Sequence, residues 1–258
     1  MRNTLFVLVL LSAVLVSSCN NTYIEGKIVD GFGKPVPEAT VNVEGTDFVS
    51  QTNGKGHYRI TYVPGDVHVV VSKEGFANSS FTTSILKEMR VDAGPTILYE
   101  IPPAEEVFLM HKGRYVELRK GVLHSSKQDV SDSWHYREQY VYSVTYNPED
   151  ITAIQKTEED VVLFDHCPGS VTLVKVMNPG TTGGTLLVRT VDNGARGFAA
   201  GDFTETRMFM EGEVVELDAP NCKLRYYTLD AGDYAIVQYN RHSLTAISGP
   251  VYLFKVID

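Results

Sequence analysis

The sequence contains few of the features that carry catalysis or nucleic-acid binding. It has one tryptophan and three cysteines in 258 residues, and it lacks a G-x-S-x-G nucleophile motif, a phosphate loop and a dinucleotide-binding fingerprint. Lysine and arginine do not cluster, and the formal net charge is −9, so we expect no nucleic-acid partner. With 43% hydrophobic residues and no low-complexity tract, the chain is predicted to form one or two globular domains.

A hydrophobic run long enough for a comfortable membrane span is also missing near the N-terminus. The apolar run Leu5–Val16 is shorter than the roughly 20 residues that a spanning helix needs. Arg2 precedes the run and two serines follow it, which is typical of a secretory signal. Residues 1–18 are therefore predicted to be a signal peptide.

The residues after this run resemble the lipobox of bacterial lipoproteins. The motif is Val-Ser-Ser-Cys, ending at Cys19. The resemblance implies cleavage before Cys19 and acylation of its sulfur, so that residues 19–22 form a lipidated tether and the bilayer is a partner. The residue after Cys19 is Asn20 and not Asp, which favours the outer membrane over the inner membrane. The sequence does not decide which face of the membrane the protein occupies. The alternative is an ordinary signal peptide with an incidental Cys19.

The remaining cysteines, Cys167 and Cys222, form an even pair. In an oxidising compartment such a pair is a candidate disulfide, and closing this loop would contribute on the order of 4 kcal/mol if unstrained. Two buried free thiols are the alternative, and the sequence does not decide between them.

Short alternating segments separated by Gly, Pro and Asn turns fill the stretch from Tyr23 to about residue 100 and predict a small β-sandwich. The segment Asn53–Gly56, for example, predicts a tight hairpin. The punctuating residues resemble the carboxypeptidase regulatory-like family: Gly26, Ile28, Asp30, Gly33, Pro35, Val36, Ala39, Val41, Val43, Gly45, Thr52, Gly56, Tyr58, Pro64, Gly65, Lys73, Gly75 and Phe76.

This resemblance implies a transthyretin-like β-sandwich over residues 23–100. Domains of this family are accessory: they stabilise, connect or present other domains and have no active site of their own. The family usually has an acid where this chain has Asn53, a departure that affects a turn. The first domain is therefore predicted to be a spacer and adaptor.

A Pro-Pro step marks residues 101–106 as a short linker. Residues 107–258 are again rich in strand patterns and resemble no family, so we predict a β-sandwich or jelly-roll-like domain of unknown function. One short helix is expected here, because Pro148 stands at its start and Ile151 and Ile154 are spaced i, i+3. The predicted fold class is thus all-β with a single helix.

A series of aromatic residues in the second domain stands at even-numbered positions, which places the side chains on one face of a strand. Trp134, Tyr136 and Tyr140 begin this series. On an exposed sheet face such rings stack on sugars or anchor protein partners. The alternative is that this face of the strand points inward and its aromatic side chains form the core. Trp134, Tyr136 and Tyr140 are the candidate ligand-binding residues, and a protein or glycan of the envelope is the expected partner.

No metal or catalytic site is predicted. His135 and Glu138, with His242 later, mimic the ligand spacing of a metallocarboxypeptidase, but residues i and i+3 of a strand point to opposite faces. Asp165, His166 and Cys167 are adjacent and would diverge in the same way.

The predicted function is a non-enzymatic, lipid-anchored envelope protein without a cofactor, in which an adaptor domain presents an interaction module. Two alternatives stay open. One is a hydrolase or metal-dependent enzyme in the second domain that uses Cys167 or the histidines. The other is a structural accessory subunit of an envelope assembly.

Overall fold

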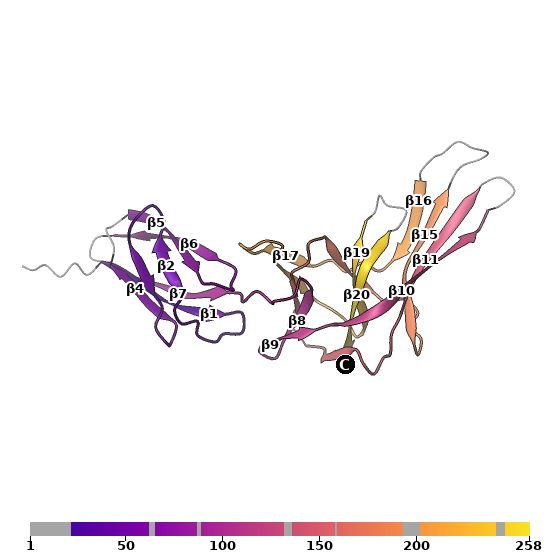
Figure 1. Cartoon of the computed structure of the whole chain (residues 1–258), viewed down its shortest axis with the longest axis horizontal. Helices are drawn as coiled ribbons and strands as arrows, with labels where there is room; N and C mark the ends of the chain where they lie inside the picture. The colour runs from indigo at the N-terminus through magenta and orange to yellow at the C-terminus, as the bar shows by residue number, and fades with distance from the viewer. Residues whose placement is uncertain are drawn as a thin grey trace, which may run out of the picture. The chain divides into compact units, whose positions relative to one another are not determined.

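A computed structural model describes residues 22–61, 65–86, 89–131, 136–157, 159–192, 202–240 and 246–258 (Figure 1). The chain divides into two compact units, Met1–Glu100 and Ile101–Asp258. Both are built of strands, which confirms the predicted all-β class. The described part of the chain contains no helix with the length and hydrophobicity of a membrane span.

The first unit is a two-layer sandwich. A three-stranded sheet has the order β4-β1-β7 and a four-stranded sheet the order β3-β2-β5-β6. Strands β1 and β7 are parallel, whereas β1 and β4 are antiparallel. The strands are β1 (Tyr23–Asp30), β2 (Thr40–Val43), β3 (Val49–Gln51), β4 (His57–Thr61), β5 (Gly65–Ser72), β6 (Ser79–Ile85) and β7 (Arg90–Leu98).

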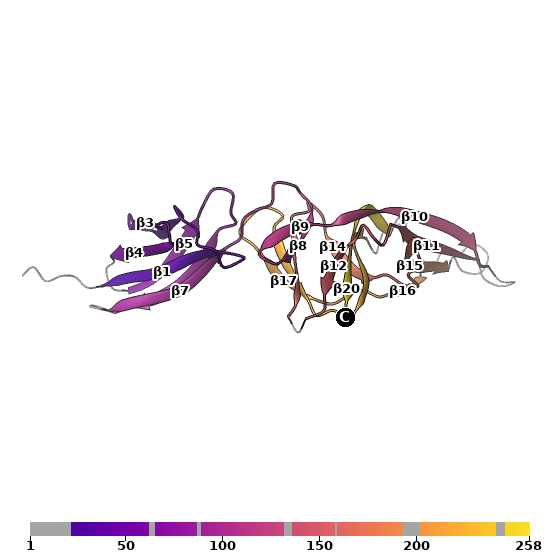
Figure 2. The same ribbon diagram turned by 90° about the horizontal axis from the view of Figure 1, so that it is seen from below.

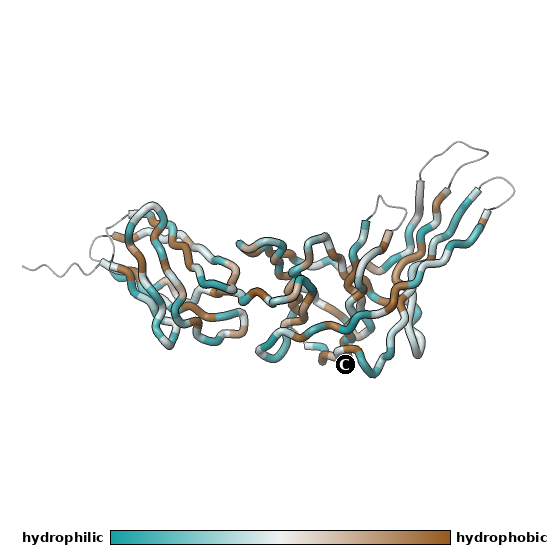
Figure 3. The backbone as a smooth tube through the Cα atoms, viewed as in Figure 1, coloured by the Kyte–Doolittle hydropathy of each residue, from teal (hydrophilic) through white to brown (hydrophobic). Residues whose placement is uncertain are grey.

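The period-2 pattern of the sequence places the core of this unit between its two sheets. Ile24 and Ile28 of β1 face Val69 and Val71 of β5, and all four side chains are fully buried. Apolar and polar residues alternate along many strands (Figure 3), as expected where one face of a sheet is buried and the other is hydrated.

The second unit is also built of two sheets. An eight-stranded sheet follows the order β14-β19-β20-β10-β11-β15-β16, with β12 added parallel to β20, and a five-stranded sheet follows β17-β18-β13-β8-β9 (Figures 1 and 2). The strands are β8 (Val107–His111), β9 (Arg114–Glu117), β10 (Arg119–Asp129), β11 (Arg137–Thr145), β12 (Thr152–Gln155), β13 (Val161–Asp165), β14 (Val171–Lys175), β15 (Gly183–Asp192), β16 (Asp202–Arg207), β17 (Glu213–Glu216), β18 (Lys223–Tyr227), β19 (Gly232–Tyr239) and β20 (Ile247–Ile257).

Strands β19 and β20 are buried on both faces. Tyr234 and Phe254 belong to a core that includes residues of both sheets. Their neighbours Ala235 and Leu253 point the other way, into a second core with β11 and β15. Continuous apolar runs rather than alternation are expected of such strands, and these strands are indeed buried core strands.

The predicted helix after Pro148 is wrong. The structure has a turn over residues 148–150 and then strand β12. Asn147 closes the turn, because its side-chain oxygen accepts the N–H of Glu149 at 3.2 Å. Parallel pairing of β12 with the last four residues of β20 then buries Ile154. Tertiary pairing therefore overrides a local helical pattern that only two apolar residues support.

Cys167 and Cys222 are both buried and free in the structure, which therefore contains the alternative of two thiols and not the candidate disulfide. They lie close to the same strand end, since Cys167 follows β13 by two residues and Cys222 directly precedes β18, its antiparallel neighbour. Cys19 lies outside the described residues.

Candidate functional site

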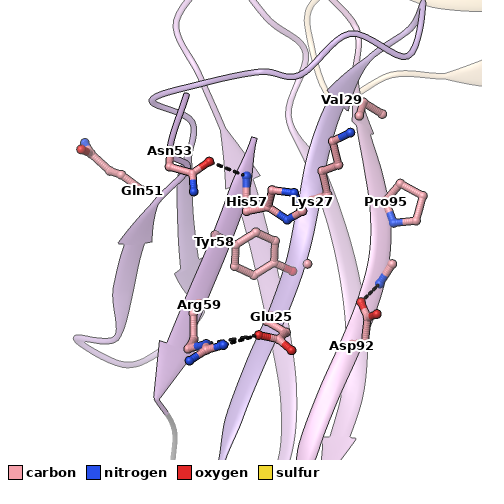
Figure 4. Close-up of a pocket in the computed structure, with 12 residues that line it drawn as sticks. Glu25, Lys27, Val29, Gln51, Asn53, His57, Tyr58, Arg59, Asp92 and Pro95 are labelled. Carbon is pink, nitrogen blue, oxygen red and sulfur yellow. Dashed lines mark hydrogen bonds and ion pairs between the residues drawn. The ribbon is translucent and has the colours of Figure 1, made fainter. Parts of the chain in front are cut away.

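A groove lies on the three-stranded sheet of the first unit, with a cavity volume of about 920 Å³ (Figure 4). Alternation along β1 and β4 turns Glu25, Lys27, His57 and Arg59 away from the core. The Arg59 guanidinium donates to Glu25 Oε2 at 2.7 Å. Across the groove, Asp92 of β7 accepts the Gly94 N–H at 2.9 Å.

The turn before β4 is organised by the side chain of Asn53. Its Oδ1 accepts the backbone N–H groups of Lys55 at 2.9 Å and His57 at 3.1 Å. A carboxylate would accept the same two bonds, so Asn53 fills the position without adding a charge to the groove.

Tyr58 also lines the groove, yet its ring belongs to the core. It lies opposite Gly26 in the sheet register, and a Cβ on Gly26 would come within 2.8 Å of the Tyr58 hydroxyl. The hydroxyl is buried and has no hydrogen-bond partner. Burial, and then the charge of Asp92, raise the pKa of Tyr58 to about 12.

Tyr58→Phe is therefore expected to stabilise the first unit by up to about 1 kcal/mol, because it removes an unsatisfied buried hydroxyl. Urea unfolding measures the change. Tyr234→Phe is the matched control, since the Tyr234 hydroxyl donates to the Asp230 carbonyl at 2.7 Å and its loss should cost about 1 kcal/mol. Equal destabilisation by both variants would mean that the Tyr58 hydroxyl has a partner in solution.

Residues 23–97 match the family model of the carboxypeptidase regulatory-like domain. The first unit is a carboxypeptidase regulatory-like domain. No curated protein matches the chain. One chain of a type II cohesin–X-dockerin complex from Acetivibrio cellulolyticus is 16% identical to this protein. The match covers 31% of this chain and 58% of that chain, with a TM-score of 0.28.

Two further solved structures resemble most of the chain. A DUF3823 family protein from Bacteroides ovatus is 10% identical over 91% of this chain and 97% of its own, with a TM-score of 0.24. The major pilin subunit of Bacillus cereus is 10% identical over 92% of this chain and 95% of its own, with a TM-score of 0.23. Likeness at this level carries no argument about function.

Outside the regulatory-like domain, the structure separates the predicted aromatic series into core and surface. Tyr142 is buried, and Tyr146 donates to Asp233 Oδ2 at 2.6 Å inside the second unit. Tyr136 is 49% exposed and Tyr140 is half-buried. Trp134 lies outside the described residues, so the structure brings together two of the three candidate residues.

What joins the two tyrosines is Glu138, which shares their face of β11. The Tyr136 hydroxyl donates to Glu138 Oε1 and the Tyr140 hydroxyl to Oε2, each at 2.8 Å. Lys127 of β10, opposite Tyr140 in the register, forms an ion pair with Glu138 at 2.6 Å. We call Lys127, Tyr136, Glu138 and Tyr140 the aromatic patch. Its hydrogen bonds hold both rings in one orientation on a strand end.

The same contacts change the titration of Glu138. The ion pair with Lys127 and then the two tyrosine hydroxyls lower its pKa from 4.5 to about 2. Since the folded pKa lies below the unfolded one, Glu138 stabilises the fold above about pH 4.5 and loses that contribution as the pH falls toward 2. Carbon-detected NMR titration should find the low pKa, and Lys127→Met should raise it. A Glu138 pKa near 4.5 in the wild type would contradict the patch.

Other candidate reactive residues are engaged in structural contacts. His166 Nδ1 lies 3.2 Å from the carbonyls of Pro102 and Ala104, so this histidine fixes the segment predicted as a linker. Burial, and then Asp165, raise the pKa of the Cys167 thiol to about 11, whereas a nucleophilic cysteine needs a lowered pKa. No group of three or more potential metal ligands occurs among the described residues. His135 and His242 lie outside them.

The groove of the regulatory-like domain escaped sequence reasoning. Glu25 and Arg59 are 34 residues apart, and each alone is an ordinary outward position of a strand. Only the pairing of β1 with β4 brings them together. The aromatic patch was easier to predict from the sequence, because Tyr136, Glu138 and Tyr140 are spaced two residues apart and therefore share one face of a strand.

Proposed function

We propose that the chain is a non-enzymatic, lipid-anchored protein of the bacterial envelope. In this proposal Cys19 carries the acyl chains, and the outer membrane is the favoured location. The regulatory-like domain serves as spacer and adaptor, and the second unit binds a glycan or protein of the envelope. The signal-like N-terminus and the raised pKa of Cys167 support the proposal.

The aromatic patch is the observation that carries the binding role. Tyr136 offers an exposed ring beside the Glu138 carboxylate and the Lys127 ammonium. A ring face with charged hydrogen-bonding groups at its edge suits a sugar, whose C–H groups stack while its hydroxyls bond. Because the hydroxyls of Tyr136 and Tyr140 are already held by Glu138, little rotamer freedom remains to be lost on binding.

Tyr136→Ala is expected to weaken glycan binding by about tenfold or more, in the range of a central aromatic contact. Binding to an array of bacterial envelope polysaccharides and oligosaccharides measures this. Phe48→Ala removes another exposed aromatic residue, at 38% exposure in the first unit, and should leave binding unchanged. If the wild type binds no glycan but retains one envelope protein through Tyr136, the partner is a protein. Equal binding by both variants and the wild type would exclude the patch.

The anchor is tested separately, by fractionation of cells that express the full chain. Cys19→Ala is expected to abolish incorporation of labelled palmitate and to move the protein out of the washed membrane fraction. Retention of the variant in that fraction would contradict lipid anchoring at Cys19.

A further inference from the structure

Apolar side chains are exposed at one end of the first unit, where the described chain begins. Strands β1 and β7 are parallel, and their first residues, Tyr23 and Arg90, are register partners. Just before β7, Leu86 is 68% exposed and Met89 is 41% exposed. The Met89 N–H donates to the Leu86 carbonyl at 3.1 Å, and the Tyr23 N–H donates to the Met89 carbonyl at 3.2 Å. These bonds hold Leu86 and Met89 beside the start of β1.

The polar groups around this end suit an interface between water and lipid. The Arg59 guanidinium lies 4.3 Å from the centre of the Tyr23 ring, and that of Arg90 lies 5.4 Å from it. Tyrosine is enriched at membrane–water interfaces, and arginine keeps its charge in water while its stem covers apolar surface. We call Tyr23, Leu86, Met89 and Arg90 the Tyr23 end.

Charge does not explain what the Tyr23 end would bind. Arg59 is neutralised by Glu25 at 2.7 Å. Arg90 is exposed, and so is Asp66 of β5, which pairs with Ser84, two residues before Leu86. The described side chains here carry charges of both signs beside two protruding apolar side chains, which fits insertion into the boundary of a bilayer rather than attraction to anionic headgroups.

The length of chain before Tyr23 identifies the occupant. Only residues 20–22 separate Tyr23 from Cys19, and four Cα–Cα steps span at most about 14 Å. A lipid on Cys19 would therefore hold the Tyr23 end close to the bilayer surface, where the effective concentration of lipid is very high. Ile97, near the other end of β7, is seven residues beyond Arg90, which corresponds to roughly 23 Å along the strand.

We propose that the Tyr23 end docks on the lipid surface, with Leu86 and Met89 inserted at the level of the headgroups. The inference depends on the lipid anchor of the proposed function and adds to it: the regulatory-like domain stands in a fixed orientation on the membrane instead of swinging on a free tether. An adaptor held in this way directs β7 away from the bilayer.

Fluorescence of the full-length lipidated protein tests the docking. The protein is reconstituted into vesicles of phosphatidylethanolamine and phosphatidylglycerol, with Trp134→Phe as background so that a single introduced indole reports. In Leu86→Trp, we expect a blue-shifted emission and at least about threefold stronger quenching by brominated lipids than in Ile97→Trp. Ile97 is also an exposed apolar residue, at 43%, and it lies on the same domain. Replacing phosphatidylglycerol with phosphatidylcholine should leave the difference unchanged.

The outcomes separate the docking from the anchor. If both variants float with the vesicles and are quenched equally, or neither is quenched, the docking is overturned and the anchor stands. If neither variant floats with the vesicles, lipid anchoring fails and the docking fails with it. A difference that disappears without phosphatidylglycerol would overturn apolar insertion as its cause.

Discussion

Asp165→Ala is expected to destabilise the second unit by about 3–5 kcal/mol, the cost of leaving one partner of a buried ion pair alone. The Asp165 side chain is fully buried. Arg225 of β18 donates its Nε–H to Asp165 Oδ2 at 2.9 Å and forms an ion pair with the same oxygen, 2.8 Å from Nη2. The other oxygen, Oδ1, accepts the Cys167 N–H at 3.1 Å. Without the carboxylate, a guanidinium that is almost as deeply buried has lost its counter-charge.

Urea unfolding measures this cost, and Glu216→Ala is the matched control. Glu216 forms an ion pair with Lys223 at 2.9 Å in the same sheet, but its side chain is 69% exposed, and such pairs contribute about 0–1 kcal/mol. Adding Arg225→Met to Asp165→Ala should recover much of the loss, because the stranded charge is gone. If Asp165→Ala costs no more than Glu216→Ala, water or another group must compensate Arg225.

The fold of the regulatory-like domain was predictable because its information is local. Turn glycines and prolines punctuate the strands, and period-2 valines mark the buried face. The short stretch from Thr152 to Gln155 was not predictable in this way, because its state depends on β20, about a hundred residues later.

The candidate sites follow the same division between local and distant information. Tyr136 and Tyr140 were predicted as a pair because their spacing along one strand is visible, although the sequence did not reveal that Glu138 accepts hydrogen bonds from both. Pairs such as Asp165 with Arg225, 60 residues apart, carry no local signal at all. Their geometry follows from strand order, which a single sequence does not specify.

Gly56→Ala is expected to destabilise the first unit by about 3 kcal/mol or more. The φ of Gly56 is 78°, a left-handed conformation that costs a residue with a Cβ about 1–3 kcal/mol. The added Cβ would also lie only 2.4 Å from the Ile28 carbonyl oxygen. Relief of that contact must move the Gly56 carbonyl, which accepts the Ile28 N–H at 2.8 Å. One methyl group therefore strains the turn and weakens its bond to β1.

Gly54→Ala, two residues earlier in the same turn, separates this strain from a general loss of turn flexibility. A Cβ on Gly54 meets nothing within 4 Å, so this variant should change the free energy of unfolding by less than about 1 kcal/mol. The tight turn predicted here is present, closed by Gly56 N–H to the Asn53 carbonyl at 2.8 Å, but the predicted hairpin is wrong, because β3 and β4 lie in different sheets. Gly56 thus fixes the crossing between the two layers, and equal unfolding free energies of the two variants would contradict that role.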